Sequence, residues 1–498
     1  MRCVVFGATG YIGGRLVPAL LAAGHQVRAV ARTPDKLTEV PWRDRVEIVK
    51  GDVTDLSSIR HAVAGKDVVY YLVHSLNRRD FVDVDRRAAH ALADAARAAG
   101  VARIVYLGGI TPDAEHLSDH LASRAEVGEI LLDSGVPTIV LRAAVILGSG
   151  SASFEMLRYL TERLPAMVTP RWVHNRVQPI AVRDVLHYLT HAAALPLSVN
   201  RAFDIGGPDV LSYLEMMRRY AVAAGLPRRL VLPVPVLTPW LSAQWVNLVT
   251  PVPRSIAIPL IESLVHEVVC HNQDVAGYIA DPDGGLTHYE HAVELALMHI
   301  RRADVPTRWS DASLPGAPSD PLPTDPDWSG GTLYEDIREC RCAADPRTLW
   351  DVIEAIGGEH GWYSSPLAWS VRGWIDRLIG GVGLRRGRRD PRRLHVGEAL
   401  DWWRVEYLDR PQLLRLRAEM LLPGRAWLEL AVMPDGDGGA RYRQRALFEP
   451  RGLAGHLYWK TIAPFHGIVF GGMVRNITST AEHHHTQRRE ATIRDQNR

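Results

Sequence analysis

The first 150 residues alternate short apolar runs with stretches of helical periodicity, and this alternation most constrains the fold. The apolar runs are CVVFG (3–7), QVRAVAR (26–32), VEIVKGD (46–52), DVVYYLV (67–73), RIVYLGG (103–109) and PTIVLRAA (137–144). Strands that alternate with helices at this spacing form βαβ units and a parallel sheet. The runs are rich in Val and Ile on both faces, as in strands covered by helices on both sides. The sequence therefore predicts an α/β fold with a doubly wound parallel sheet.

A glycine-rich turn, GATGYIG, follows the first run and opens the first helical stretch. Its spacing, G-x-x-G-x-x-G, permits a tight turn and the close approach of a ligand to the backbone. The helix that begins there adds a partial positive charge at its N-terminus. Because a strand precedes the motif and a helix follows it, we expect this turn to bind the pyrophosphate of a dinucleotide. The predicted contacts in the turn are Gly7, Thr9, Gly10, Tyr11, Ile12 and Gly13.

Residues at the ends of later runs indicate which dinucleotide binds. Arg32 ends the second run, where an NAD-selective site usually has Asp or Glu on the ribose 2′-hydroxyl. An Arg there pairs with a 2′-phosphate and stacks on adenine, so we expect NADP, with NAD as the alternative. Asp52 and Val53 follow the third run and are expected to flank the adenine. Val73 and His74 end the fourth run, where the carboxyl end of a parallel strand faces the cofactor.

The remainder of the chain divides into segments of different character. Residues 150–300 are less regular and predict a smaller lobe intertwined with the first domain, so that 1–302 form one NAD(P)-binding domain. Residues 303–331 are rich in Pro and Gly and predict an extended linker. Residues 332–482 alternate like antiparallel strands and end in a long amphipathic stretch, which predicts a sheet with a long C-terminal helix across it. Residues 483–498 predict a polar, frayed tail.

Composition narrows the classes of function. The net charge of +2 over 498 residues gives no global signal for nucleic acid, so no such partner is expected. Four cysteines make neither a disulfide framework nor a metal-ligand set, and we expect no metal and a cytoplasmic setting. The sequence predicts no signal peptide and no membrane-spanning helix. The apolar segment 230–253 could line a pocket, cover a partner or touch a membrane surface, and the oligomeric state is left open.

Five segments together resemble the extended and atypical short-chain dehydrogenase/reductases. They are GATGYIG (7–13), GDVTD (51–55), LRAAVILGSG (141–150), QPIAVRDV (178–185) and FDIGGPDVLSYLEM (203–216). The set looks most like the branch that includes nitrogen-metabolite-repression-regulator-like proteins and the nucleotide-binding accessory subunit of respiratory complex I. This resemblance implies a Rossmann fold over about 1–300. Together with the C-terminal region it resembles bacterial two-domain oxidoreductase-like proteins, whose second part is similar to the polyketide-cyclase and lipid-transfer helix-grip superfamily.

The resemblance also implies a catalytic Tyr-x-x-x-Lys on the helix after the fifth run, preceded by a Ser or Thr. Here that helix, at 117–131, carries His120 and Arg124, and the fifth run ends in Gly108 and Gly109. Residues i and i+4 lie on one face of a helix, so the pair would face the nicotinamide. A histidine titrates near ~6.5 and can act as a general acid or base, whereas Arg cannot relay a proton. His120 is therefore either a catalytic acid beside Arg124, or both residues only bind the ribose.

Three functions stay open at this point. The first is an NADP-dependent oxidoreductase for an apolar carbonyl or quinone-like substrate, with the backbone of Arg142, at the end of the sixth run, against the nicotinamide. The second is a non-catalytic NADP-binding redox sensor or scaffold. The third places function in the C-terminal region, where many Trp residues line either a cavity for an apolar ligand or a plain core. The arginine-rich segment 385–393 could touch phosphates or a membrane, or be a solvated loop.

Overall fold

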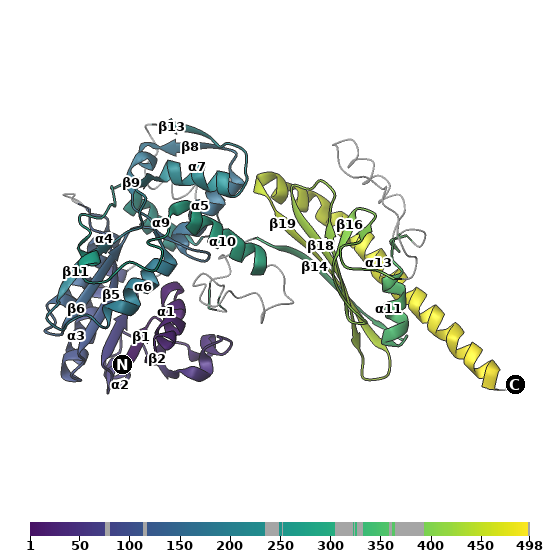
Figure 1. Ribbon diagram of the computed structural model, residues 1–498, viewed down its shortest axis with the longest axis horizontal. Helices are drawn as coiled ribbons and strands as arrows, with labels where there is room; N and C mark the ends of the chain where they lie inside the picture. The colour runs from purple at the N-terminus through teal and green to yellow at the C-terminus, as the bar shows by residue number, and fades with distance from the viewer. Residues whose placement is uncertain are drawn as a thin grey trace. The chain divides into compact units, whose positions relative to one another are not determined.

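The chain divides into two compact units, Met1–Gly331 and Thr332–Arg498 (Figure 1). The computed structural model describes residues 1–74, 80–112, 117–234, 249–250, 252–303, 322, 324–325, 332–357, 361–363 and 393–496.

A seven-stranded parallel sheet forms the centre of the N-terminal unit, in the order β11-β6-β5-β4-β1-β2-β3. Its strands are β1 (Arg2–Phe6), β2 (Gln26–Ala31), β3 (Glu47–Lys50), β4 (Val68–Tyr71), β5 (Arg103–Gly109), β6 (Thr138–Ala143) and β11 (Arg201–Ile205). All neighbouring strands run parallel. The predicted doubly wound α/β fold is confirmed. In such a sheet a ligand binds at the carboxyl ends of the strands, where the strand order reverses between β1 and β4.

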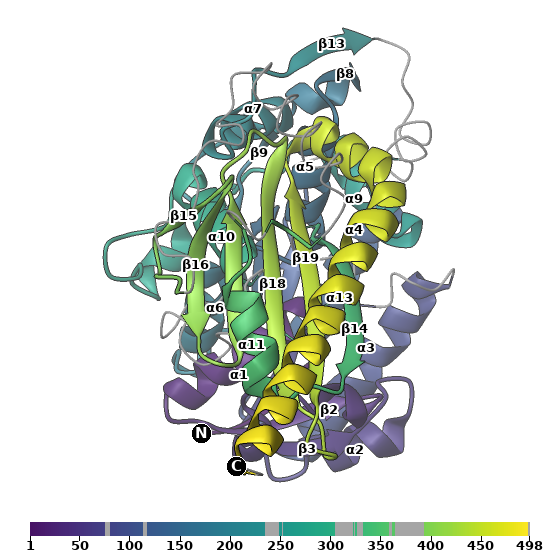
Figure 2. The ribbon, with the colours of Figure 1, turned by 90° about the vertical axis from the view of Figure 1, so that its right-hand side faces the viewer.

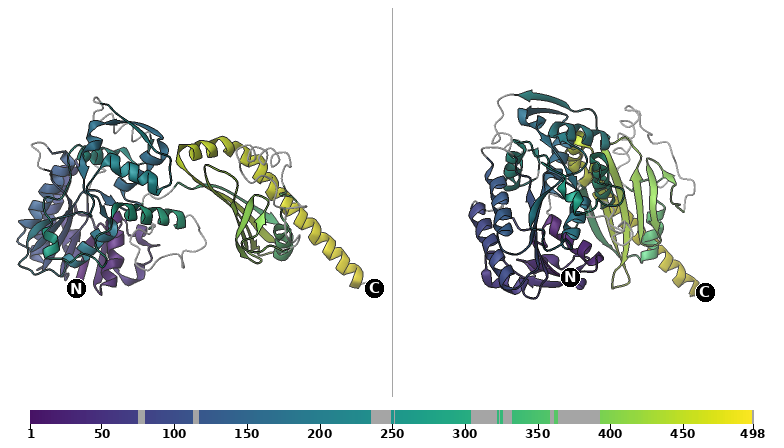
Figure 3. Two further views of the ribbon diagram at one scale, coloured as in Figure 1. Left: turned by 45° about the horizontal axis from the view of Figure 1, so that its top comes forward. Right: turned by 60° about the vertical axis from the view of Figure 1, so that its left-hand side comes forward.

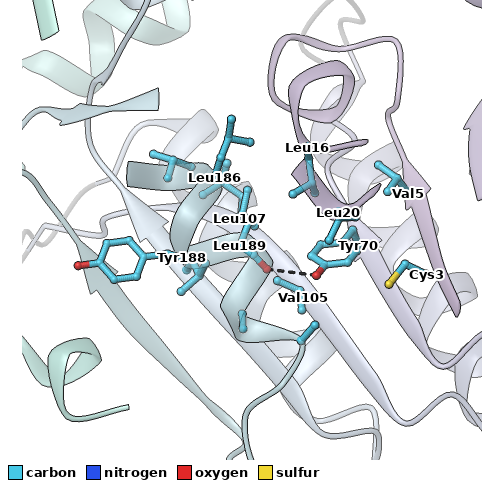
Figure 4. Close-up of a cluster of buried hydrophobic side chains, with 14 of the residues drawn as sticks. Cys3, Val5, Leu16, Leu20, Tyr70, Val105, Leu107, Leu186, Tyr188 and Leu189 are labelled. Carbon is cyan, nitrogen blue, oxygen red and sulfur yellow. Dashed lines mark hydrogen bonds between the residues drawn. The ribbon is translucent and has the colours of Figure 1, made fainter. Parts of the chain in front are cut away.

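Helices cover both faces of the parallel sheet. They are α1 (Tyr11–Ala22) and α6 (Val182–Ala192) on one face, and α2 (Leu56–Val63), α3 (Phe81–Ala98) and α4 (Asp119–Leu132) on the other. Consecutive strand residues point to opposite faces, so Tyr70 enters the core with α1 and α6, whereas Tyr71 enters the opposite core. The Tyr70 hydroxyl donates to the Leu189 carbonyl at 3.2 Å (Figure 4). Both tyrosines therefore belong to the core.

A smaller lobe is formed by residues that lie before and after β11 in the sequence, between Ile146 and Ala303. Its helices are α5 (Ala152–Arg163), α7 (Tyr213–Ala223), α9 (Arg254–Leu264) and α10 (Tyr289–Ala303). Its strand pairs are β7 (Ile146–Leu147) with β10 (Ile180–Ala181), β8 (Ala166–Pro170) with β13 (Leu230–Val234), and β9 (Arg176–Val177) with β12 (Leu211–Ser212). An apolar core of its own, which includes Phe154, Met216 and Tyr220, holds the lobe together. The lobe places α9 against α4 of the main domain.

The C-terminal unit is an antiparallel sheet of six strands in the order β14-β19-β18-β17-β16-β15. The strands are β14 (Tyr334–Cys342), β15 (Ala399–Leu400), β16 (Trp403–Asp409), β17 (Leu413–Ala418), β18 (Gly424–Pro434) and β19 (Ala440–Pro450). Two helices, α11 (Pro346–Glu354) and α13 (Gly452–Gln496), pack against the sheet, and α13 runs along one of its faces (Figure 2; Figure 3). The predicted antiparallel sheet with a long C-terminal helix is confirmed.

The polar tail is the part of this unit for which the sequence prediction is wrong. Residues 483–496 continue α13 without a break. The reason is a set of side-chain contacts with α11 and its N-terminal turn: His485 lies 2.9 Å from Asp345, and Arg488 lies 3.0 Å from Asp351. These contacts, together with the good helix propensity of Arg, Glu and Gln, stabilise a helix that its polarity alone did not indicate.

Several predicted features have a plain structural account or lie outside the described residues. Trp350, Trp362, Trp402 and Trp403 belong to the apolar core of the C-terminal unit. Within segment 230–253, β13 exposes Leu230 and Leu232, and residues 235–248 lie outside the described part. Of segment 385–393, only Arg393 is described. Among the helices of the described chain, none combines the length and apolar character needed to cross a bilayer.

Candidate functional site

The glycine turn after β1 has the geometry of a phosphate cradle. Gly7 has a φ of 86°, and a Cβ there would lie 2.7 Å from the Leu72 carbonyl oxygen. A Cβ on Gly13 would lie 2.1 Å from the Gly7 oxygen. Gly10 is the N-cap of α1, and no side chain caps that end of the helix. The first N–H groups of α1, around Tyr11 and Ile12, therefore remain available to an anion.

A short piece near the end of the N-terminal unit, at 322–325, packs against the same helix. Asp325 forms a two-pronged ion pair with Arg15 of α1, with nitrogen–oxygen distances of 2.8 and 2.7 Å. The side chains are 3% and 7% exposed. Leu322 covers Gly14, where a Cβ would lie 2.8 Å from its Cδ1. The sequence predicted an extended linker here, but nothing in its composition indicated that it contacts the cofactor helix.

The expected adenine-side residues follow β2 and β3. Arg32 is exposed, and no described residue forms a hydrogen bond or ion pair with its guanidinium. Asp52 accepts hydrogen bonds from the backbone N–H and the hydroxyl of Thr54, at 2.9 and 2.8 Å. Val53 is buried beside it. An unengaged guanidinium next to this small polar turn fits an anionic group on the ribose.

A cavity opens at the carboxyl ends of β5 and β6. Its volume is about 140 Å³, close to the ~150 Å³ at which an apolar cavity admits one benzene ring. Most of its lining is apolar, and His120, Arg124, Ser153, Tyr213 and Ser263 add polar groups. The remaining lining residues are Leu107, Gly108, Gly109, Ile110, Leu121, Ala143, Ala144, Val145, Ile146, Met156, Leu260, Leu264 and Val268. The space suits one ring of an apolar molecule or of a cofactor.

His120 stands in the first turn of α4 and is 9% exposed. Its Nδ1 lies 3.0 Å from the hydroxyl of Ser263, which donates to the Pro259 carbonyl at 2.8 Å. Burial, reinforced by the nearby charge of Arg124 and by His74, lowers the pKa of His120 to about 2. The ordinary histidine pKa near ~6.5 therefore does not apply to His120, and its imidazole is neutral at physiological pH.

His74 follows β4 and lies beside His120, with ring centroids 5.1 Å apart. Its Nδ1 is 2.6 Å from a carboxylate oxygen of Asp85 on α3. Burial lowers the pKa of His74, and the hydrogen bond to Asp85 opposes that shift only in part. Val73 precedes it at the same edge of the sheet.

The two arginines predicted at the nicotinamide end of the cofactor have protein partners. Arg124 donates to the backbone carbonyl of Leu107 at 2.5 Å, and its guanidinium lies over the Tyr106 ring at 5.8 Å from the centroid. Arg142 donates to Asp204 at 2.7 Å. The backbone of Arg142, not its side chain, was expected to meet the nicotinamide. The residues that follow it, Ala143 to Ile146, line the cavity.

Three residues of the site were not found from the sequence. Asp85 and Ser263 fix the two histidines, and Tyr213 lines the cavity from the first position of α7. The Tyr213 hydroxyl is buried, and no described residue offers it a hydrogen bond. Of these three, only Tyr213 had a signal, because Ser212 and Glu215 around it form a capping box that marks the start of a helix.

Two family models match the chain, one in each unit. Residues 7–145 match the NAD(P)H-binding family, and residues 328–473 match a family described as a protein of unknown function, DUF2867. The first match covers the glycine cradle, both histidines and the fifth strand. The cofactor of this region is therefore a nicotinamide dinucleotide, as the sequence predicted.

Curated relatives match just under half of the chain. An uncharacterized protein of Mycobacterium tuberculosis is 27% identical over 46% of this chain, and the match spans 24% of that protein's length. The ceramide reductase of Caulobacter vibrioides is 29% identical over 46% of this chain and 72% of its own length. Subunit 9 of the NADH dehydrogenase [ubiquinone] 1 alpha subcomplex of Arabidopsis thaliana is 26% identical over 47% of this chain and 60% of its own length.

Among solved structures, the triphenylmethane reductase of Citrobacter sp. is similar in fold. It has 21% sequence identity and a TM-score of 0.50, and the alignment covers 60% of this chain and 100% of that one. The N-terminal unit is thus an NAD(P)-binding Rossmann domain similar to short-chain dehydrogenase/reductases, in agreement with the resemblance drawn from its motifs. The kinship of the C-terminal unit to helix-grip proteins stays a prediction.

Proposed function

We propose that the protein is an NADP(H)-dependent reductase that acts on an apolar, quinone-like acceptor in the cavity beside His120. The observation that carries this proposal is the position of that cavity, at the carboxyl ends of β5 and β6, with a mostly apolar lining and a neutral histidine. In a Rossmann domain the reactive end of the cofactor lies at this edge of the sheet. Bound NADPH would supply a hydride there.

The preference for NADP over NAD rests on Arg32. Its exposed guanidinium follows β2, where an acidic residue would bond the 2′-hydroxyl of NAD. A guanidinium matches a 2′-phosphate instead, because it can form two parallel charge-assisted hydrogen bonds. A cytoplasmic setting is consistent with the four free cysteines of the chain.

The choice of acceptor follows from the low pKa of His120. A simple ketone that takes up a hydride becomes an alkoxide, which is about as basic as hydroxide, with a pKa near ~16 for its conjugate acid, and needs a proton donor at once. A quinone that takes up a hydride becomes a phenolate-like anion, with a pKa near ~10, which takes its proton from water. His120, whose pKa lies at about 2, is not a general acid at neutral pH. The site therefore favours the quinone-like acceptor over the simple carbonyl.

A second function, NADP(H) binding without catalysis, is favoured by a separate observation. Arg124 stands where the Lys of related enzymes is expected, and it donates to the Leu107 carbonyl. His120 stands in the place of the Tyr and is held by Ser263. With both positions engaged in the fold, the domain would act as a redox sensor or scaffold.

One experiment separates these functions. NADPH is titrated by its fluorescence, and its oxidation is then followed with a single-ring quinone, tetramethyl-1,4-benzoquinone, and with benzaldehyde as acceptors. We expect NADPH to bind and to be oxidised much faster with the quinone. Binding with no oxidation by either acceptor would support the second function, and failure to bind NADPH would overturn both.

A cavity variant locates the reaction. Ala144→Leu places a larger side chain in the cavity lining, and Ala122→Leu makes the same change at an exposed position of α4. We expect Ala144→Leu to lose quinone reduction while keeping NADPH binding, and Ala122→Leu to keep both. Equal activity of the two variants would place the reaction elsewhere.

A further inference from the structure

Two buried imidazoles lie next to each other at the carboxyl edge of the sheet, and neither is accounted for by the reduction chemistry above. His74 comes from the end of β4 and His120 from the first turn of α4, with their ring centroids 5.1 Å apart. Each has one ring nitrogen held by the protein. The identity of the two partners determines which nitrogen of each ring carries the hydrogen.

The tautomer of His120 follows from Ser263. The serine hydroxyl has a single hydrogen, which it donates to the Pro259 carbonyl at 2.8 Å. Its oxygen can therefore only accept from His120, whose Nδ1 lies 3.0 Å away. Nδ1 carries the hydrogen, and Nε2 of this neutral ring keeps a bare lone pair.

The tautomer of His74 follows from Asp85 in the same way. An ionised carboxylate only accepts hydrogen bonds, so Nδ1 of His74, 2.6 Å from Asp85, carries the hydrogen. Its Nε2 is buried and has no hydrogen-bond partner among the described residues. A histidine that serves only the core usually has its buried nitrogens satisfied, and an orphaned acceptor at the cofactor edge therefore indicates a missing donor.

We propose that the bare Nε2 atoms of His74 and His120 accept hydrogen bonds from the hydroxyls of the nicotinamide ribose. Asp85 and Ser263 are then positioning residues, since each holds one imidazole in the accepting tautomer. A ribose offers two neighbouring hydroxyl donors, which matches two neighbouring acceptors. This inference rests on the proposed cofactor site and adds how the nicotinamide half is recognised.

In this arrangement the hydrogen bonds between protein and ribose run in the opposite direction to those that the resemblance implies. A Lys at the position of Arg124 would donate to the ribose hydroxyls, but here the guanidinium donates to the Leu107 carbonyl. In the proposed arrangement the ribose hydroxyls act as donors to the two neutral rings. Acceptors of this kind add no charge beyond that of Arg124 to the mostly apolar cavity lining.

The test compares two ligands that differ in the nicotinamide half. NADPH carries the nicotinamide ribose, whereas adenosine 2′,5′-bisphosphate carries only the adenine half. Asp85→Asn provides an amide that can donate to Nδ1, so that His74 can move its hydrogen to Nε2. Ser263→Ala removes the acceptor that holds His120. Asp83→Asn is the matched control, because Asp83 lies on the same helix and its side chain is 70% exposed.

We expect Asp85→Asn and Ser263→Ala each to weaken NADPH binding about tenfold, the loss of one hydrogen bond of ~1.4 kcal/mol. Affinity for adenosine 2′,5′-bisphosphate should stay unchanged in both variants, and that affinity also reports that the protein is folded. The control should bind both ligands as the parent protein does. Either an equal loss for both ligands or an unchanged NADPH affinity would overturn the inference.

The outcomes also separate this inference from the proposed function. If the parent protein binds neither ligand, the proposed function fails. If the variants lose NADPH affinity selectively and no acceptor is reduced, the ribose contacts stand and the reductase activity fails. If quinones are reduced and the variants bind NADPH normally, the reductase stands and the ribose contacts fail.

Discussion

The two sheets of the molecule distribute their polar residues in opposite ways. In the parallel sheet the inner strands are largely buried on both faces, as in β4, where all four residues from Val68 to Tyr71 are buried. In the antiparallel sheet β14 alternates exposed and partly buried residues along most of its length. There, Glu335 lies 2.6 Å from Arg445 and Glu339 lies 3.5 Å from Arg443 on the neighbouring strand.

Because of this difference, a polar residue predicts different things in the two sheets. In the parallel sheet, two ion pairs also bridge neighbouring strands, Arg28 with Glu47 and Arg142 with Asp204. His74 after β4 and Arg32 after β2 instead follow strand ends, at the proposed cofactor edge. In the antiparallel sheet, charges recur along the strands because one face carries cross-strand ion pairs. A charge that follows a parallel strand and has no partner among the described residues, such as Arg32, is therefore a candidate for function, whereas a charge along β14 indicates a paired face.

The largest effect should come from breaking a buried ion pair in the N-terminal unit. Asp325→Asn leaves the Arg15 guanidinium, 3% exposed, without its carboxylate. Removing one partner of a buried pair costs about 3–5 kcal/mol, and we expect the low end because Arg15 also donates to the Tyr11 carbonyl at 3.1 Å. Denaturant unfolding, with hydrogen exchange of α1 peptides, measures the loss. A change below ~1 kcal/mol would mean that this pair behaves like a surface pair.

The next largest effect should come from the phosphate cradle. Gly13→Ala places a Cβ 2.1 Å from the Gly7 oxygen, which forces the turn to shift. We expect NADPH affinity to fall about 100-fold, or ~2.7 kcal/mol, measured by fluorescence titration. Gly436→Ala in the C-terminal unit is the control, because a Cβ there would meet nothing within 4 Å. Retained affinity in Gly13→Ala would remove the cradle from the cofactor site.

The sequence predicted those features whose cause is local. The glycines of the cradle follow from a backbone turn, and His74 follows from the end of a buried strand. Ser263 could not be predicted, because it meets His120 across 143 residues of sequence, through the packing of α9 against α4. The low pKa of His120 has the same origin, since the fold buries the ring between His74 and Arg124. The spacing of a motif predicts that two residues share one side of a helix, but not how deeply the fold buries them.

An intermediate effect concerns the pH dependence of stability. The pKa of His120 is about 2 in the folded protein and near ~6.5 in an unfolded chain. The unfolded state takes up a proton below pH ~6.5 and the folded state does not, so the stabilisation from this neutral ring is complete above ~6.5 and is lost as pH falls. His120→Gln should reduce that loss by about 1.4 kcal/mol per pH unit. Unfolding at pH 7 and pH 5.5 measures it, and equal slopes for both proteins would contradict the burial argument.

The same pKa predicts the pH profile of turnover. His120 stays neutral over the whole pH range tested. The rate of quinone reduction should therefore show no change near pH ~6.5 that depends on His120, and the parent protein and His120→Gln should have the same pH profile there. Rates from pH 5.5 to 8, at saturating NADPH, provide the check. A limb at that pH in the parent protein alone would restore His120 as a proton donor.

The smallest effect should come from the paired face of the antiparallel sheet. The side chains of Glu339 and Arg443 are 45% and 40% exposed, so water and salt screen their attraction. Glu339→Gln should therefore lower the free energy of unfolding of the C-terminal unit by less than about 1 kcal/mol, and by still less at high salt. Denaturant unfolding at low and high ionic strength, followed by hydrogen exchange in β14, measures both. A loss as large as that of Asp325→Asn would mean that charges on this face are as specific as those of the buried pair, and the contrast between the two sheets would not hold.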